Sequence, residues 1–301
     1  MRAVAINPST RARARLWLRS EQAFGQEALP LRKRESADET LKESEKSQNP
    51  APSPPKTASA PKPAAKSPLA LRQLPDPSPL ELYTTAPDSP PLAPPSLPPL
   101  SREEKTRLLA ELEEQQVRIC TKCRLSQTRT QTVFGEGDVD ASIFFIGEGP
   151  GETEDQTGRP FVGRAGKLLD QMITAMGLKR EQVYIANIVK CRPPANRTPA
   201  PDEVETCSPY LVRQLEIIRP RTIVTLGLPA SKYMLSSNST MGRLRGQWHQ
   251  WRGIQLMPTF HPAFLLRSYT VENRQAVWSD LQKVMEAVGL DKKGRKVEEP
   301  V

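Results

Sequence analysis

An acidic, glycine-rich segment, residues 147–166, carries side chains suited to proton or water chemistry in this chain of 301 residues. It follows an apolar run, residues 143–146, whose β-branched and aromatic side chains predict a buried strand. A dinucleotide-binding loop fits poorly, because its third glycine should open a helix and because acids such as Glu148 and Glu154 would repel a pyrophosphate. Carboxylates at the end of a strand favour a catalytic loop over a purely structural turn.

The cysteines form a second group with chemical potential. Cys120 and Cys123 are spaced as C-x-x-C, and Cys191 and Cys207 follow with fifteen residues between them, so that no cysteine is left over. A disulfide framework is not expected, because the chain is neither short nor rich in cysteine. Thiolates at this spacing bind zinc or an iron–sulfur cluster, and the spacing alone slightly favours structural zinc.

Four apolar, strand-like runs alternate with helical stretches and must position these groups. The expected strands are residues 142–146, 183–189, 222–226 and 254–259. The expected helices are residues 163–176, 201–218, 229–236 and 271–288. This alternation predicts an α/β fold, a three-layer α/β/α arrangement with a four-stranded, mostly parallel central sheet.

Three polar groups follow predicted strands. The acidic segment follows the first strand, Asn187 stands at the end of the second, and His261 comes after the fourth. Ligands of open parallel sheets bind at the carboxyl ends of the strands, so we expect these groups to meet in one site.

The acidic segment closely resembles, from Gly147 to Gly166, the first motif of the family 4 uracil-DNA glycosylases, the iron–sulfur members of the uracil-DNA glycosylase superfamily. The resemblance implies a DNA repair enzyme that hydrolyses the N-glycosidic bond of uracil in DNA and leaves an abasic site for base excision repair. It also implies that the four cysteines bind a [4Fe–4S] cluster, which reverses the preference for zinc and leaves zinc as the alternative.

The resemblance implies a substrate-binding set. Phe161 resembles the aromatic residue that stacks on the flipped base, although a lone Phe beside Val is otherwise a core residue. The amide of Asn187 can both donate and accept, which matches the O4 and N3–H edge of uracil. Glu148 and Gly149 are expected to contact the base, Glu148 through its backbone or a bound water. His261 resembles the histidine that donates a hydrogen bond to uracil O2.

The attacking water and the DNA wedge complete the expected site. Glu154 is the candidate for orienting water or for excluding the methyl group of thymine, and Asn196 is the candidate for holding the attacking water. The run Leu265, Leu266 and Arg267 resembles a wedge that fills the space left by the extruded base. Other acids of the loop are expected to be solvated.

The composition divides the chain into three parts. Residues 1–100 are basic and rich in Pro, Ala and Ser, which predicts a disordered extension and a possible tether for a protein partner. Residues 101–290 are expected, from the resemblance, to form a uracil-DNA glycosylase-like catalytic domain, whose first helix begins at a capping box, Ser101 to Glu104. Residues 291–301 are expected to form a disordered tail.

The net charge of +9 and the pI of about 9.5 favour a polyanionic partner such as DNA, and the resemblance implies that this DNA contains uracil. Lys122 and Lys190, beside the cysteines, are expected to lie near that DNA. No apolar run approaches the length of a membrane span, and the N-terminus lacks the apolar core of a secretory signal. We therefore expect a monomeric, cytoplasmic, nucleoid-associated protein.

Two alternatives remain at this point. One is a superfamily member that traps the abasic product covalently; it carries an Arg-rich insert ending in His, which is absent from residues 191–197 here. The other is a non-catalytic iron–sulfur DNA-binding module. Intact Glu154, Asn187 and His261 argue against that module, since it would need none of them.

Overall fold

The central sheet has its four long strands in parallel, as the sequence predicts. In the computed structural model, which describes residues 100–291 and 294–295, six strands form one sheet in the order β1-β3-β2-β4-β6-β5. The strands are β1 (Glu136–Gly137), β2 (Ile143–Gly147), β3 (Tyr184–Asn187), β4 (Thr222–Leu226), β5 (His249–Trp251) and β6 (Ile254–Thr259). Residues 1–99 of the extension predicted for residues 1–100, and most of the predicted C-terminal tail, lie outside the described residues.

The two outer strands correct the predicted count of four. β1 pairs antiparallel with β3, and β5 pairs antiparallel with β6. β1 has only two residues, too few to show a periodic pattern. β5 and β6 form a hairpin around Arg252 and Gly253, whose φ angles of 46° and 83° are those of a two-residue type I′ turn. Sequence reasoning missed β5 because three residues are too few to show a periodic pattern.

Eight α-helices of the described chain surround the sheet. They are α2 (Arg102–Leu112), α3 (Glu152–Thr157), α4 (Arg164–Ala175), α5 (Pro201–Ile218), α6 (Leu228–Leu235), α7 (Met241–Leu244), α8 (Pro262–Arg267) and α9 (Val271–Ala287). A π-helical turn (Glu113–Val117) extends α2, and short 3₁₀ turns occur at Arg124–Gln127, Arg180–Gln182 and Pro194–Asn196. None of the helices within residues 100–291 is long and apolar enough to cross a bilayer.

The predicted helices agree with those observed to within one or two residues at each end. α5 has the predicted bounds, and α6 begins and ends one residue earlier than predicted. The capping box at the start of α2 is confirmed: the Ser101 hydroxyl accepts from the Glu104 N–H, and the Glu104 carboxylate accepts from the Ser101 N–H. Both contacts satisfy backbone donors that have no partner inside the helix.

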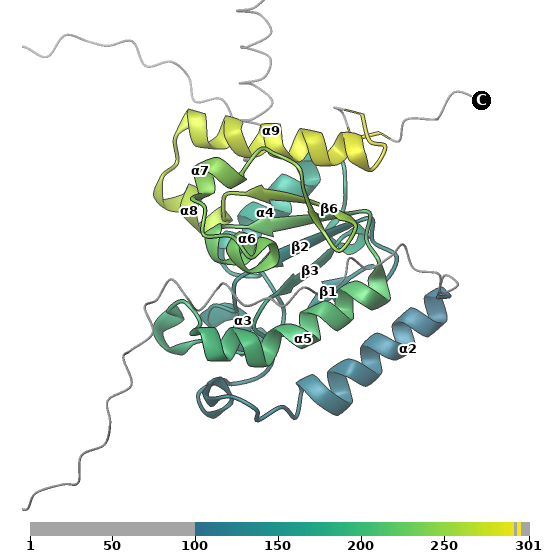
Figure 1. Ribbon diagram of the computed structural model, residues 1–301, viewed down its shortest axis with the longest axis vertical. Helices are drawn as coiled ribbons and strands as arrows, with labels where there is room; N and C mark the ends of the chain where they lie inside the picture. Colours follow the sequence, from purple (N-terminus) through teal and green to yellow (C-terminus); the bar gives the residue numbers. More distant parts are fainter. Residues whose placement is uncertain (1–99, 292–293, 296–301) are drawn as a thin grey trace, which may run out of the picture. The chain divides into compact units, whose positions relative to one another are not determined.

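Helices cover both faces of the sheet, which confirms the three-layer arrangement (Figure 1). One buried cluster joins α2, α5 and α6 to residues of alternate strand positions such as Phe144 and Ile146. The other joins α4, α8 and α9 to the intervening positions, such as Ile143 and Phe145. Because both faces are covered, β2 is fully buried along its length and reads as a continuous apolar run.

Candidate active site

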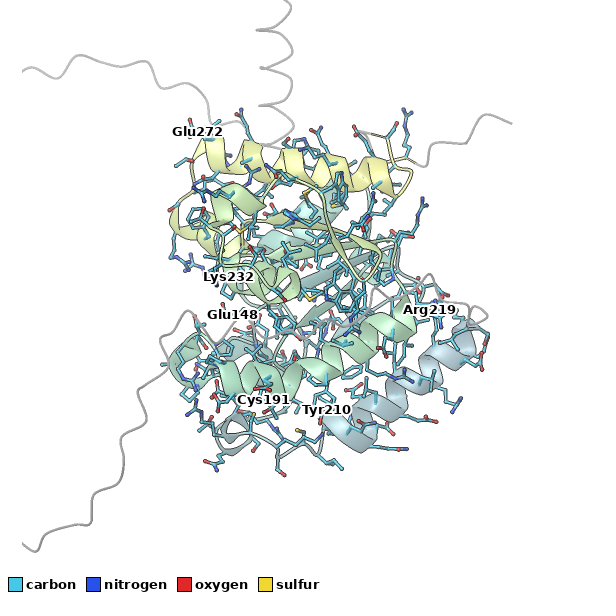
Figure 2. The ribbon with its side chains drawn as sticks, viewed as in Figure 1. Glu148, Cys191, Tyr210, Arg219, Lys232 and Glu272 are labelled. Atoms are coloured by element: carbon cyan, nitrogen blue, oxygen red, sulfur yellow. The ribbon has the colours of Figure 1, made fainter. Side chains whose placement is uncertain are left out.

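A cavity of about 680 Å³ lies where the loops after β2, β3, β4 and β6 meet. Its lining includes eight of the residues predicted from the sequence: Glu148, Gly149, Glu154, Phe161, Asn187, Asn196, His261 and Arg267. Figure 2 shows Glu148 among the side chains of this region. The expected meeting of the acidic loop, the amide and the imidazole in one place is therefore confirmed, while the role of each residue stays a prediction.

His261 is held as a neutral imidazole. It is the N-cap of α8, and its Nδ1 accepts the backbone N–H of Ala263 at 3.0 Å, so that its proton lies on Nε2. Burial lowers the pKa of His261 to about 4, and the positive charge of Arg267 acts in the same direction, while Glu154 opposes it. The ring therefore offers the cavity an N–H donor without carrying a charge.

Two buried oxygen atoms at the carboxyl ends of β2 and β3 have no hydrogen-bond partner among the described residues. One is Asn187 Oδ1, at the end of β3, and the other is Glu148 Oε1. Burial raises the pKa of Glu148, and a hydrogen bond with Thr198 partly offsets this effect. A buried acceptor without a donor is costly, so these two atoms mark the place where a ligand would supply donors.

The Phe161 ring lies against His261, with ring centroids 5.6 Å apart and planes tilted by 32°. A Cβ atom at Gly147 would lie 2.5 Å from Phe161 Cζ and 2.3 Å from Asn187 Oδ1, so only glycine fits there. Phe161 also packs into the apolar cluster beneath α4. Phe161 is thus a core residue with one surface on the cavity, and its stacking on the flipped base stays a prediction.

Glu154 has a structural task that the sequence did not reveal. Its Oε1 accepts the backbone N–H groups of Val162 and Gly163 at 2.9 and 2.8 Å. The neighbouring Asp155 corrects the expectation of a solvated acid, because it is buried and both of its oxygens lie 3.0 Å from the N–H of Thr130. Both Glu154 and Asp155 thus accept hydrogen bonds from backbone N–H groups of loops, a role that the amino-acid composition cannot predict.

The predicted wedge is only partly available. Leu265 is fully buried in the cluster between the sheet and α9, so its assignment to the wedge is wrong. Leu266 is 38% exposed, and Arg267 lines the cavity. The three residues belong to one helix, α8, whose 3.6-residue period directs neighbouring side chains to different surfaces.

Asn196 lies at the rim of the cavity and is exposed. Its Oδ1 accepts from Arg192 Nε at 2.8 Å, and its φ of 53° is left-handed.

Sequence reasoning overlooked the loop after β4, although Gly227 there lines the same cavity. A Cβ atom at Gly227 would lie 2.9 Å from His261 Cβ, and its φ is 90°. The strand predicted at residues 222–226, which ends directly before this glycine, was the signal that could have identified it.

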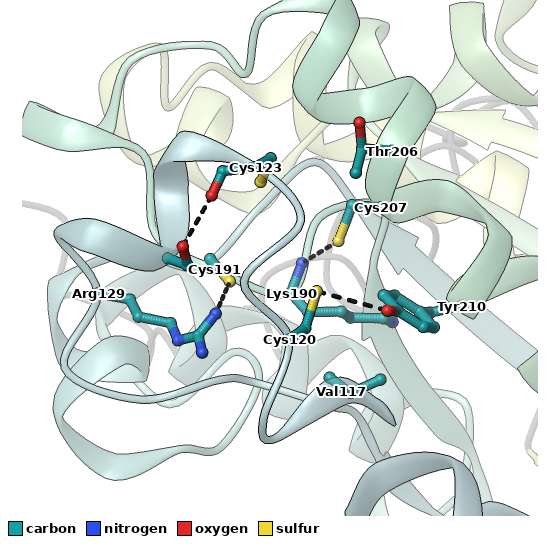
Figure 3. Close-up of a pocket in the computed structure, with 10 residues that line it drawn as sticks. Val117, Cys120, Cys123, Arg129, Lys190, Cys191, Thr206, Cys207 and Tyr210 are labelled. Atoms are coloured by element: carbon teal, nitrogen blue, oxygen red, sulfur yellow. Dashed lines mark hydrogen bonds between the residues drawn. The ribbon is translucent and has the colours of Figure 1, made fainter. Parts of the chain in front are cut away.

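The four cysteines line one small pocket, and none forms a disulfide (Figure 3). They come from the segment after α2, the loop after β3, and α5. Arg129 Nη1 lies 3.1 Å from Cys191 Sγ, and the Tyr210 hydroxyl lies 3.4 Å from Cys120 Sγ. Burial raises the pKa of Cys191 and raises that of Cys207 to about 12.

As they stand, no three Cys, His, Asp or Glu side chains of the described chain are arranged to hold one metal ion. The donor set nevertheless fits a thiolate-bound group, because four free sulfurs and an arginine face one space.

Lys190 corrects another expectation. It is fully buried, and its Nζ donates to the carbonyl oxygen of Asn187 at 2.9 Å and to Gln214 Oε1 at 2.6 Å. Burial lowers its pKa to about 7. Its backbone N–H lies 3.2 Å from Cys207 Sγ. Lys190 therefore joins the cysteine pocket to the strand that carries Asn187 and is buried away from the surface, whereas Lys122 is exposed.

Comparison with known proteins agrees with these features. Residues 134–282 match the family model described as the uracil DNA glycosylase superfamily. A type-4 uracil-DNA glycosylase of Thermotoga maritima is 47% identical over 185 residues, which cover 61% of this chain and 94% of that protein. A type-4 enzyme of Sulfurisphaera tokodaii is 48% identical over 182 residues, 58% of this chain and 82% of the relative. A type-5 uracil-DNA glycosylase of Pyrobaculum aerophilum is 31% identical over 144 residues, which cover 42% of this chain and 63% of that protein.

Proposed function

Because this chain belongs to the uracil-DNA glycosylase superfamily, we propose that it removes uracil from DNA by hydrolysing the N-glycosidic bond, as a base excision repair enzyme of type 4. One observation carries the proposal: a neutral histidine, an aromatic ring and an amide oxygen with no partner among residues 100–291 line one cavity at the carboxyl ends of the strands. The substrate is DNA containing uracil, which suits the basic net charge.

The chemistry follows from what each group can do. A base inside a duplex is out of reach, so the uracil nucleotide must turn outward into the cavity. There the Phe161 ring stacks on it, and Asn187 Oδ1 accepts its N3–H. When the bond between C1′ and N1 breaks, its electron pair remains on uracil. The Nε2–H of His261 donates to O2, where negative charge develops, and so lowers the barrier. Water then adds to C1′ and loses a proton, which balances the negative charge on the departing uracil, and the products are the abasic site and free uracil.

We assign the attacking water to Asn196 and Glu154. Both line the cavity, and this placement is what supports the assignment. One oxygen of Glu154 is committed to backbone N–H groups, so only the other could contact water. Glu148 and Gly149 complete the wall beside the base, and Leu266 with Arg267 supply the wedge.

We also propose that the four cysteines hold a [4Fe–4S] cluster, with zinc as the alternative. Four free thiols in one pocket, with Arg129 directed at one sulfur, support this assignment. When bound, the cluster would act as a structural staple between the segment after α2, the loop after β3, and α5. Monomeric state, cytoplasmic location and a protein partner of the N-terminal extension remain predictions.

Cleavage of a labelled single-stranded oligonucleotide tests the reaction. After incubation and alkali, strand scission at uracil supports turnover. A shifted protein–DNA band would instead indicate a covalent trap, and neither result would indicate a binding module. The same oligonucleotide with thymine is the control.

Metal content tests the cluster separately. Anaerobically purified protein should absorb in the visible range and contain iron and acid-labile sulfide; zinc alone would overturn the assignment. Cys207→Ser should lose that absorbance, whereas Ser126→Ala, which alters a hydroxyl lining the same pocket, should keep it.

A further inference from the structure

Phe161 adopts a backbone conformation that is rare for an aromatic residue. Its φ is 51°, in the left-handed region, where the backbone of any residue other than glycine is strained. Such a conformation persists only when the surroundings enforce it. The residues around it, 160–163, are called the Phe161 turn below. What enforces this turn determines how the ring faces the cavity.

Two side chains of opposite charge, Glu154 and Arg180, hold the Phe161 turn by hydrogen bonds. Glu154 accepts the N–H groups of Val162 and Gly163. Arg180 donates to the carbonyl oxygens of the turn: Nη1 to that of Phe161 at 3.2 Å, and Nη2 to that of Pro160. The N–H groups and the C=O groups of the turn are thus bound by opposite charges.

Arg180 is itself fixed in place. It lies just before β3 and is only 14% exposed. Its Nε donates to Glu136 Oε1 at 2.7 Å, and its Nη1 donates to Asp170 Oδ1 at 2.6 Å. Glu136 belongs to the edge strand β1, and Asp170 belongs to α4. The guanidinium group therefore joins the sheet edge, a helix and the Phe161 turn, and it is not among the residues that line the cavity.

We infer that Arg180 is a positioning residue of the enzyme: with Glu154, it fixes the Phe161 turn so that the ring is preorganised to stack on the extruded base. The inference rests on the proposed function. Without Arg180, the two carbonyl oxygens lose their donors, and the turn can relax toward ordinary φ values that move the ring. Stacking acts on the bound base before and during bond cleavage alike, so its loss weakens binding more than it slows the chemical step.

A neighbouring residue provides a matched control. Arg159 pairs with the same carboxylate, Nε to Glu136 Oε2 at 2.8 Å and Nη2 to Oε1 at 3.1 Å. It is 61% exposed, and within the described part of the chain its guanidinium donates to Glu136 and not to the carbonyl oxygens of Pro160 or Phe161. Arg159→Ala thus removes one arginine from Glu136 but leaves the turn bound.

The test compares kcat, KM and inhibition by free uracil for the full-length wild type, Arg180→Ala, Arg180→Lys and Arg159→Ala. We expect Arg180→Ala to raise KM and the inhibition constant of uracil roughly 10- to 100-fold with kcat within about threefold, since small misplacement of a binding group can cost up to 100-fold. Arg180→Lys should recover part of the loss, and Arg159→Ala should match the wild type. Equal effects in Arg159→Ala, or wild-type constants in Arg180→Ala, would overturn the inference.

A double-mutant cycle with Phe161→Ala separates positioning from general destabilisation. If Arg180 acts through the ring, removing Arg180 should not raise KM further once the ring is gone. An additive further loss would overturn the inference. Should Arg180→Ala fail to fold, the cycle is run with Arg180→Lys. A wild type that releases no uracil would refute the proposed function, whereas an active wild type with an unaffected Arg180 variant would refute only the positioning role.

Discussion

Replacing His261 by alanine should slow cleavage while leaving DNA binding nearly unchanged. The Nε2–H of the neutral ring acts on charge that appears on uracil O2 mainly in the transition state, so its loss should be seen in kcat. Removing one preorganised donor of this kind costs roughly 100- to 1,000-fold in kcat, or about 3–4 kcal/mol. Affinity for the oligonucleotide should stay within about twofold, because phosphate contacts supply most of it.

The acid side of the pH profile follows from the same geometry. With a pKa of about 4, His261 stays neutral down to about pH 5, so kcat should not fall near pH 6.5, where an ordinary histidine titrates. Protonation would place a second N–H on Nδ1, opposite the Ala263 N–H that it now accepts. Loss of activity is therefore expected only as the pH approaches 4.

Stability should respond over the same range. The unfolded chain takes up a proton at His261 near pH 6.5, whereas the folded chain does so only near pH 4. The free energy of unfolding should therefore fall as the pH drops from 6.5 to 4, by at most about 3 kcal/mol from this group. His261→Ala should lack this component of the slope.

Single-turnover cleavage measures the rate of bond cleavage and its pH dependence. Fluorescence anisotropy with labelled DNA measures the affinity, and urea unfolding measures the free energy of unfolding. His249→Ala is the control, because His249 is the only other histidine and its Nε2 is bound to the Leu244 carbonyl oxygen. A weakened affinity with unchanged kcat, or an acid limb of kcat near pH 6.5 that His261→Ala removes, would refute the reasoning.

Three further substitutions probe the base pocket and the wedge. Asn187→Asp should lower the rate of uracil release and raise the rate of cytosine release relative to that of uracil. Unchanged relative rates, measured on oligonucleotides that differ only in the target base, would show that Asn187 does not recognise the edge of the base. Gly147→Ala should abolish binding of free uracil in a folded protein, because the new Cβ would overlap Asn187 Oδ1 and the Phe161 ring; calorimetry with uracil and circular dichroism test this. Leu266→Ala should slow cleavage of double-stranded substrate more than single-stranded substrate, since a wedge acts only when a stack must be opened, and equal slowing would contradict that role.

The sequence predicted those features that depend on burial over several residues. β2 and β4 are buried on both faces and therefore appear as continuous apolar runs. Once parallel strands were inferred, the meeting of Asn187 and His261 followed, because the carboxyl ends of parallel strands share one edge. The edge strands β1 and β5 escaped detection because two or three residues carry no period.

Features that depend on a single hydrogen bond or on the direction of one side chain were not predictable. Leu265 and Leu266 are chemically alike, yet one is buried and the other exposed, because helix α8 directs them to different surfaces. Lys190 is a positively charged residue type that commonly contacts DNA, but its Nζ makes hydrogen bonds to buried oxygen atoms. Arg180 looked like any charged residue of a loop, and only the fold places it beside the Phe161 turn.

The pocket should reject cytosine and thymine by different means, and this difference gives the positioning of Phe161 a second consequence. Cytosine presents an acceptor where uracil has N3–H, so it would leave Asn187 Oδ1 buried and unpaired; a site that requires such a hydrogen bond can discriminate by roughly 10⁴-fold or more. Thymine has the same polar edge as uracil, and only its extra methyl group distinguishes it.

Rejection of a methyl group depends on walls that do not move. Glu154, the residue expected to exclude that methyl group, lines the cavity and is hydrogen-bonded to Val162 and Gly163 of the Phe161 turn. Loosening this turn through Arg180→Ala should therefore increase the ratio of thymine to uracil release, while the ratio of cytosine to uracil release stays low, because the unpaired amide oxygen is unaffected. Single-turnover release of each base from matched oligonucleotides measures both ratios. A parallel rise in cytosine release would show that the substitution disturbs Asn187 as well, and would contradict a separate role for the turn.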